Sequence, residues 1–119
     1  MLRQSKRISG KNRVSQILNE GGKAHSSFFV LRTLATNDSP RQRYAVVVGK
    51  KISTQAVTRN RTRRRIYEAI RMLEAQTTPT EPYEDRVLIA RTGAIKAPFE
   101  GLTTDLKKIL AAPRYLPNL

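Results

Sequence analysis

The fold is decided by the stretch Lys50-Lys-Ile-Ser-Thr-Gln-Ala-Val-Thr-Arg-Asn-Arg-Thr-Arg-Arg-Arg-Ile-Tyr67, which opens the longest helix that the sequence predicts. This helix runs from about Gln55 to Ala75, and Ser53 or Thr54 can cap its first turn. One stripe along it is apolar at helical spacing. That stripe consists of Ile66, Ala69, Ile70 and Leu73. The other side is strongly basic, so we expect the helix to pack on a core with one side and present cations on the other.

The sequence predicts a strand on each side of this helix. Arg43-Tyr-Ala-Val-Val-Val-Gly49 precedes it, and Arg86-Val-Leu-Ile-Ala-Arg91 follows it. The residues from Thr77 to Asp85 include two prolines and predict a loop before the second strand. A strand before and a strand after a helix form a β-α-β unit, which favours a mixed sheet.

Another strand is predicted upstream, at Phe28-Phe-Val-Leu-Arg-Thr-Leu34, which is rich in aromatic and branched residues. The cluster Asn37-Asp-Ser-Pro40 then predicts a turn. Because about eight turn-rich residues separate this strand from the one at Arg43, we expect the two to pair as antiparallel neighbours. The region from Ser26 to Gly49 leaves room for one further strand, which would bring the sheet to four.

Two shorter helices complete the prediction. The first runs from about Lys11 to Glu20, where Val14, Ile17 and Leu18 form one apolar face and two glycines follow as a stop. The second runs from about Pro98 to Ala112. We therefore expect one α+β domain over residues 1–119, a mixed four-stranded sheet packed with three helices. Its basic first nine residues are expected to be mobile until a partner orders them.

Composition limits the function. The 119 residues include 23 Lys or Arg and only 9 Asp or Glu, for a net charge of +14, which indicates a polyanionic partner. The absence of Cys excludes disulfides and thiolate metal sites, and a lone histidine, His25, argues against a catalytic triad or a histidine metal site. The sequence shows no membrane span and no signal peptide, so we expect a soluble, cytoplasmic protein.

The basic side of the long helix is the main candidate for binding. Five arginines fall between Arg59 and Arg65, and arginine outnumbers lysine by 15 to 8 in the whole chain. Guanidinium groups bind phosphate through paired hydrogen bonds and stack on bases, so this bias favours nucleic acid. A helical wheel directs one set of polar side chains away from the core: Asn60, Arg61, Arg64, Arg65 and Arg71, with Arg59 and Arg63 beside the apolar stripe. The one acid, Glu68, can pair with Arg64 or Arg71 but cannot neutralise the cluster.

This arrangement resembles the protein subunits of bacterial ribonuclease P. The most specific part is Lys50-Lys-Ile, then Ala56-Val, then Arg59-Asn-Arg61 and Arg64. Phe29-Val-Leu-Arg-Thr-Leu34 is similar to the family's first strand, and Val87-Leu-Ile-Ala-Arg91 to its last. The similarity covers nearly the whole chain.

The resemblance implies a small α+β subunit with a left-handed β-α-β crossover. It implies binding to a large catalytic RNA and assistance in removing the 5′ leader from precursor tRNA, with no small-molecule substrate and no membrane. The chemistry would belong to the RNA and its Mg²⁺ ions, with no catalytic residue and no metal held by protein side chains alone. The expected contacts to the RNA subunit are Lys50, Lys51, Arg59, Asn60, Arg61, Arg63 and Arg64. The expected leader cleft, between the first helix and the sheet, contains Val14, Leu18, Val30, Arg32 and Val47.

The sequence departs from the family pattern in the expected cleft. Val14 and Leu18 stand where many relatives have aromatic residues on the first helix, and Arg32 stands where an aromatic residue is common on the first strand. Tyr67 replaces a common basic residue at the end of the helix motif. These changes bring base stacking in the cleft into question, and Arg32 could contact phosphate or stack on a base instead.

Two other functions stay open at this point. A small ribosomal or ribosome-assembly protein could share the charge and the fold class. A self-sufficient nuclease would need paired carboxylates for metal ions. The acids Glu81, Glu84 and Asp85 lack that spacing, and we expect them to be structural or solvated.

Overall fold

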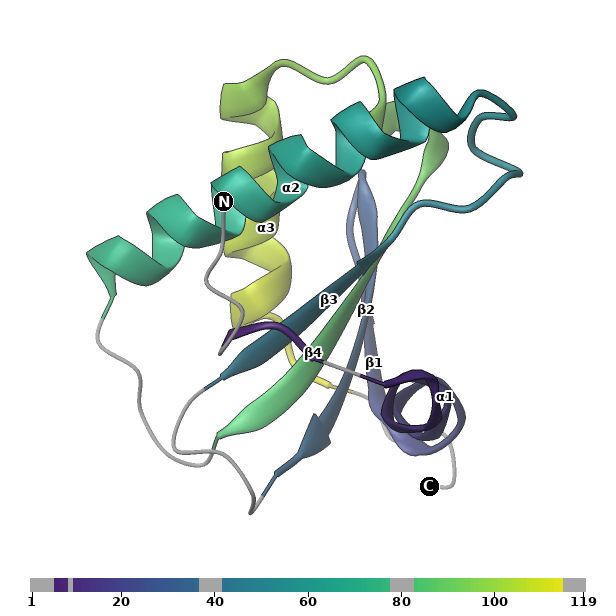
Figure 1. The fold of residues 1–119 in the computed structure, drawn as a ribbon. Helices are drawn as coiled ribbons and strands as arrows, with labels where there is room; N and C mark the ends of the chain where they lie inside the picture. The colour runs from purple at the N-terminus through teal and green to yellow at the C-terminus, as the bar shows by residue number, and fades with distance from the viewer. Residues whose placement is uncertain (1–5, 9, 37–41, 78–82, 115–119) are drawn as a thin grey trace.

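The computed structural model describes residues 6–8, 10–36, 42–77 and 83–114, and within these ranges it has three α-helices and four strands (Figure 1). The elements in chain order are α1 (Lys11–Glu20), β1 (Gly22–His25), β2 (Phe29–Ala35), β3 (Arg43–Val47), α2 (Ala56–Gln76), β4 (Glu84–Ala90), the 3₁₀ turn η2 (Thr92–Ala94) and α3 (Phe99–Ala111). The predicted α+β class and the three helices are confirmed.

The strands form one mixed sheet in the order β1-β2-β4-β3. β4 lies between β2 and β3, antiparallel to β2 and parallel to β3. The β3-α2-β4 unit is therefore confirmed, while its left-handedness stays a prediction. The expected antiparallel pairing of the strands at Phe28 and Arg43 is wrong, because β4 inserts between them and takes the hydrogen bonds of both.

The fourth strand is present but lies outside the region from Ser26 to Gly49. It is β1, which pairs antiparallel with β2 as the edge of the sheet. The two glycines predicted to end the first helix have different roles. Gly21 ends the helix, with its N–H donating to Ile17 O at 2.8 Å, and Gly22 begins β1. A Cβ on Gly21 would lie 2.5 Å from the Thr33 carbonyl oxygen, so only glycine lets the chain turn this close to β2.

The two faces of the sheet are covered unequally. Figure 1 shows α2 and α3 together on one side and α1 on the other. Between the sheet and the α2–α3 pair lies the main core, which includes Phe29, Leu31, Ile66, Ile70, Leu88, Leu102 and Leu106, all fully buried. α1 buries one residue completely, Ile17, so the sheet face on its side is only partly covered.

Several predicted boundaries shift by a few residues. α2 starts at Ala56 with Gln55 as N-cap, and neither Ser53 nor Thr54 caps it; Ser53 Oγ accepts a hydrogen bond from the Gln55 N–H instead. The predicted loop from Thr77 to Asp85 is too long, because Glu84 and Asp85 already belong to β4. The predicted turn at 37–40 and most of the first nine residues lie outside the described ranges. Of the first nine, Ile8 is described, and its N–H donates a hydrogen bond to the carbonyl oxygen of Tyr44 in β3.

Candidate nucleic-acid interface

The basic side of α2 is exposed, as its sequence predicts. Asn60, Arg61 and Arg64 are exposed on the helix, and Lys50 and Lys51 are exposed in the turn before it. Arg59 and Arg63 are half-buried. Here "the basic surface" means the five cations Lys50, Lys51, Arg61, Arg63 and Arg64. In the part of the chain that the structure describes, no carboxylate lies within ion-pair distance of any of them.

Two of the expected RNA contacts also organise their neighbours. Arg59 Nη1 donates to the Ser53 carbonyl oxygen at 2.9 Å, which ties the helix to the turn that carries Lys50 and Lys51. Asn60 Oδ1 accepts a hydrogen bond from Arg63 Nη1 at 2.8 Å. The Asn60 amide therefore fixes the direction of one guanidinium on the basic surface.

Arg65 does not belong to the basic surface, and its predicted direction away from the protein is wrong. Its guanidinium donates to Ala97 O at 2.6 Å and to Ile95 O at 3.4 Å. These carbonyls lie in the segment between η2 and α3, which folds back against α2. A helical wheel gives the direction of a side chain but not the loops that approach it from elsewhere.

Arg71 is likewise occupied. It forms an ion pair with Glu68 at 2.5 Å, one of the two pairings expected from the sequence. The hydrogen bond from Arg71 lowers the pKa of Glu68 to about 2. Glu68 pairs with Arg71 in this way, and among the described residues no carboxylate lies within ion-pair distance of Arg64.

The residues of the expected leader cleft lie on α1 and on the sheet face that α1 covers, and their role stays a prediction. Val30 pairs with Ile89, and Ile89 pairs with Val47, so these three apolar side chains form a row across β2, β4 and β3. Val14 and Leu18 of α1 are half-buried, as are all three residues of the row. The apolar row beside α1 is therefore only half covered by protein.

A buried carboxylate fixes α1 above this row. Asp85 of β4 is fully buried; Arg13 Nε of α1 lies 2.8 Å from its Oδ2, and Arg43 Nη2 of β3 lies 2.7 Å from the same oxygen. Arg43 Nε also donates to Asp85 Oδ1 at 2.7 Å, so the Arg43–Asp85 ion pair is bidentate. Of the acids expected to be structural or solvated, Asp85 is thus structural, and Glu81 lies outside the described ranges.

Arg32 of β2 lies beside the C-terminal end of α1. Its Nη2 donates to the Gly21 carbonyl oxygen at 3.0 Å, and the side chain is half-buried. His25, at the end of β1, is exposed.

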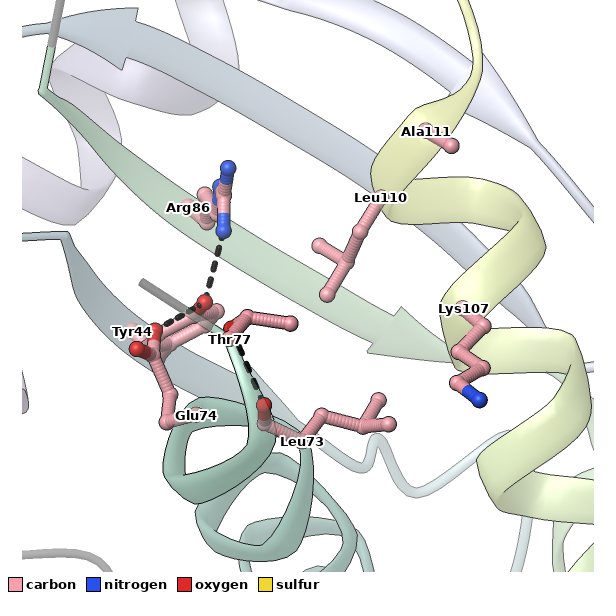
Figure 2. A pocket seen from close by; sticks show the side chains of 8 residues that line it. All are labelled: Tyr44, Leu73, Glu74, Thr77, Arg86, Lys107, Leu110 and Ala111. Atoms are coloured by element: carbon pink, nitrogen blue, oxygen red, sulfur yellow. Dashed lines mark hydrogen bonds between the residues drawn. The ribbon is translucent and has the colours of Figure 1, made fainter. Parts of the chain in front are cut away.

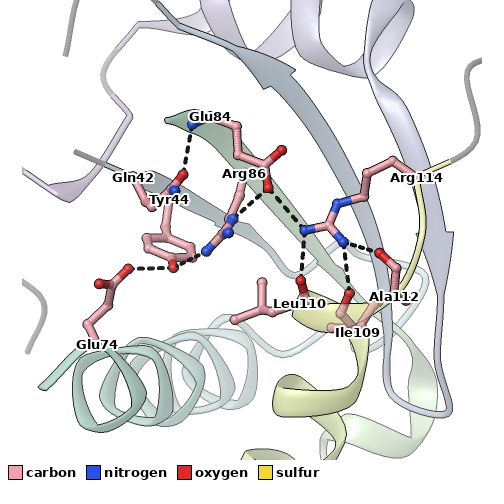
Figure 3. Close-up of polar contacts among 9 residues, drawn as sticks. All are labelled: Gln42, Tyr44, Glu74, Glu84, Arg86, Ile109, Leu110, Ala112 and Arg114. Atoms are coloured by element: carbon pink, nitrogen blue, oxygen red, sulfur yellow. Dashed lines mark hydrogen bonds and ion pairs between the residues drawn. The ribbon is translucent and has the colours of Figure 1, made fainter. Parts of the chain in front are cut away.

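A second polar centre joins β3, β4 and the C-terminal parts of α2 and α3 (Figure 3). Tyr44 OH donates a hydrogen bond to Glu74 Oε1 at 2.5 Å and accepts one from Arg86 Nη1 at 2.6 Å. Glu84 forms ion pairs with both Arg86 and Arg114. Burial, above all, raises the pKa of the Tyr44 hydroxyl. Arg114 also donates to the carbonyls that end α3.

A pocket of about 250 Å³ adjoins this centre (Figure 2). Leu73 and Glu74 of α2 line one side, and Lys107 and Leu110 of α3 line the other. Its buried polar groups, Tyr44 and Arg86, are already bonded to protein partners. Lys107, exposed on α3, adds one cation to the lining.

Within the described ranges, no group of three His, Cys, Asp or Glu side chains lies close enough to hold a metal ion. Nor is any helix there long and apolar enough to cross a membrane.

Comparison with known proteins assigns the family. A family model described as Ribonuclease P matches residues 2–113. The ribonuclease P protein component of Gluconacetobacter diazotrophicus is 36% identical over 112 residues, covering 92% of each chain. That of Pseudanabaena sp. is 29% identical over 116 residues, covering 98% of this chain and 97% of the relative.

Solved structures show the same fold. The ribonuclease P protein of Staphylococcus aureus matches with a TM-score of 0.75 at 24% identity, covering 88% of this chain and 92% of that chain. The protein from Thermotoga maritima matches with a TM-score of 0.74 at 22% identity, covering 87% and 94%. With a family model that spans almost its whole length and relatives that align from end to end, this chain belongs to the ribonuclease P protein family.

Proposed function

We propose that this chain works by binding RNA on two separate surfaces. The basic surface of α2 and its preceding turn binds the catalytic RNA of ribonuclease P. The cleft between α1 and the sheet binds the 5′ leader of precursor tRNA. The complex removes that leader and so generates the mature 5′ end of the tRNA.

The observation that carries the proposal is the uncompensated charge of the basic surface. Five cations project from one helix and one turn, with no carboxylate of the described residues close enough to pair with them. Like charges at this spacing repel one another, so an external polyanion is the partner that stabilises them. The family membership supports the RNA subunit of ribonuclease P as that polyanion.

The two surfaces differ in chemistry, which supports different ligands. The basic surface offers guanidinium and ammonium groups on a rigid helix, suited to the phosphates of a folded RNA. The cleft offers an apolar row of Val30, Ile89 and Val47, suited to unpaired nucleotides whose bases and sugars are accessible. A leader is single-stranded, so the cleft fits it better than it fits a duplex.

In this proposal the protein supplies binding and orientation, and no side chain takes part in the chemistry. The chemistry would be supplied by Mg²⁺ held mainly by the RNA partner. The protein's cations add to the neutralisation of RNA charge and so reduce the magnesium concentration that the complex needs.

Reconstitution tests the function. The protein is added to a bacterial ribonuclease P RNA at low magnesium with precursor tRNA as substrate. We expect stimulated cleavage at the mature 5′ end and no cleavage by the protein without RNA. Failure to stimulate at every salt concentration would contradict the proposal, and magnesium-dependent cleavage by the protein alone would favour a self-sufficient nuclease.

A further inference from the structure

We propose that Lys23 and Arg32 together form a site for one backbone phosphate of a single-stranded RNA, at the β1–β2 end of the cleft. The inference rests on the proposed binding of the leader and deepens it. It adds Lys23, which sequence reasoning missed, and it names a phosphodiester as the group bound there.

The register of the sheet places the two cations side by side. Lys23 of β1 is the direct partner of Arg32 of β2 in an antiparallel pair. Direct partners project from the same face of a sheet, with Cβ atoms about 4.5–5.5 Å apart. This is the cleft face, because Val30, two residues before Arg32, belongs to the apolar row. Both long side chains can thus reach one phosphate.

Nothing in the described part of the chain neutralises this pair. No carboxylate there lies within ion-pair distance of Lys23 or Arg32. Like charges directly opposite each other destabilise a sheet, and both side chains here are half-buried, where water screens charge less well. A bound anion would remove this repulsion.

The Arg32 guanidinium is held in place but not saturated. Its Nη2 donates to the carbonyl oxygen of Gly21, the C-cap of α1, which is a favourable place for a cation. Its Nε is buried and has no hydrogen-bond partner among the described residues. The hydrogen bond to Gly21 occupies one of the five guanidinium donors of Arg32. A role for Arg32 as the cap of α1 would not explain why a second cation, Lys23, lies beside it.

The surroundings favour a nucleotide over a simple anion. His25 lies two residues beyond Lys23 on β1, opposite Val30, so it extends the polar edge along the same face. The apolar row of Val30, Ile89 and Val47 begins beside it. A phosphate on the two cations would leave the attached sugar and base next to apolar side chains, which is the arrangement that a single strand requires.

Neutral linkages in the leader test this site. Precursor tRNAs are made with a single methylphosphonate, which removes one phosphate charge, at each leader position in turn. Their binding to the reconstituted holoenzyme is measured for wild type, Lys23→Gln, Arg32→Gln and the double variant. The matched control is Lys108→Gln, which removes an exposed cation from α3 on the opposite side of the sheet.

We expect one leader linkage at which the methylphosphonate weakens wild-type binding roughly threefold to tenfold, the range of a lost charged contact. The single variants should each weaken binding of the unmodified precursor by a similar factor. In the double variant the same methylphosphonate should have no further effect, while Lys108→Gln keeps the wild-type pattern. Binding of mature tRNA and of the RNA subunit should stay unchanged in all variants.

Two outcomes would overturn the inference: full methylphosphonate sensitivity in the double variant, or wild-type affinity of that variant for the unmodified precursor. Failure of the proposed function would look different, since wild type itself would then not distinguish precursor from mature tRNA. A melting curve of each variant separates a loss of contact from a loss of folding. Arg32→Gln keeps an amide donor for Gly21 O, which makes it the milder change.

Discussion

Asp85 on β4 holds Arg13 on α1 through an ion pair of 2.8 Å, and this contact joins the cleft helix to the centre of the sheet. Arg43 binds the same carboxylate from β3, so one buried acid connects three elements. α1 buries few apolar side chains, which makes this ionic contact a large part of what fixes its position. The position of α1 over the sheet therefore depends on this buried acid.

Replacing Asp85 by Asn should lower the free energy of unfolding by about 3 kcal/mol, because two guanidiniums lose their buried counter-charge. We place the value at the low end of the known range since both arginines are 24% exposed. Urea unfolding measures it. The matched control is Asp105→Asn. Asp105 is also buried, but it accepts hydrogen bonds from two neutral donors, Ser26 Oγ and the Phe28 N–H. The amide oxygen of an asparagine can accept the same two hydrogen bonds. Equal losses in the two variants would show that the charge of Asp85 is unimportant.

Arg65 and Arg64 are neighbours in sequence with opposite expected phenotypes. Arg65→Ala removes two hydrogen bonds to the segment between η2 and α3 and should cost about 1–2 kcal/mol of stability. Arg64→Ala removes one of several exposed like charges, so its stability should change by less than about 0.5 kcal/mol. Thermal unfolding without RNA makes the comparison. A destabilised Arg64→Ala beside an unaffected Arg65→Ala would reverse our assignment of the two side chains.

High pH should destabilise the protein through Tyr44. Its folded-state pKa lies above the ordinary value of 10.0, mainly because of burial, so above pH 10 the unfolded chain loses this proton while the folded protein keeps it. The unfolded state then binds fewer protons, and the free energy of unfolding falls as pH rises. Unfolding followed across this alkaline range should show a shallower fall for Tyr44→Phe. An identical pH dependence in the variant would mean that another group is responsible.

Sulfate or phosphate should raise the melting temperature more than chloride at equal ionic strength. Multivalent anions bound at the basic surface stabilise the folded state by mass action. Sulfate also strengthens apolar burial in general, so the control is a variant with Arg61→Gln and Arg64→Gln. If this variant gains as much from sulfate as wild type does, the anion effect does not come from the basic surface.

Local patterns predicted the elements well where they were strong. The bounds of α1 are those expected, because Val14, Ile17 and Leu18 mark one face and a glycine ends it. β1 was missed since it has only four residues, and its two buried positions carry only glycine and alanine, which give a weak strand signal. The pairing of β2 with β4 was missed for another reason: the paired residues, from Ala35↔Glu84 to Phe29↔Ala90, are far apart in the sequence, and no local signal marks that distance.

The same limit applies to the candidate site. The basic surface could be predicted because charge density and helical phase are properties of one segment. The role of Arg65 could not, since it depends on a loop 30 residues away, and neither could the pairing of Lys23 with Arg32 without β1. Residues whose role needs a second segment were the ones that sequence reasoning misplaced.

Salt dependence tests the mechanism of RNA binding most directly. Each cation that neutralises a phosphate releases condensed counterions, so the logarithm of affinity falls linearly with the logarithm of salt, by about 0.7–0.9 per contact. If all five cations of the basic surface touch phosphate, the slope for the RNA subunit should be about −4. Arg61→Ala should reduce its magnitude by about 1. Asn60→Ala should weaken binding with a smaller change of slope, because Asn60 is neutral and acts by orienting Arg63 through a 2.8 Å hydrogen bond. Binding of wild type and both variants across a salt titration decides the matter: a wild-type slope in Arg61→Ala would show that this exposed guanidinium does not contact phosphate.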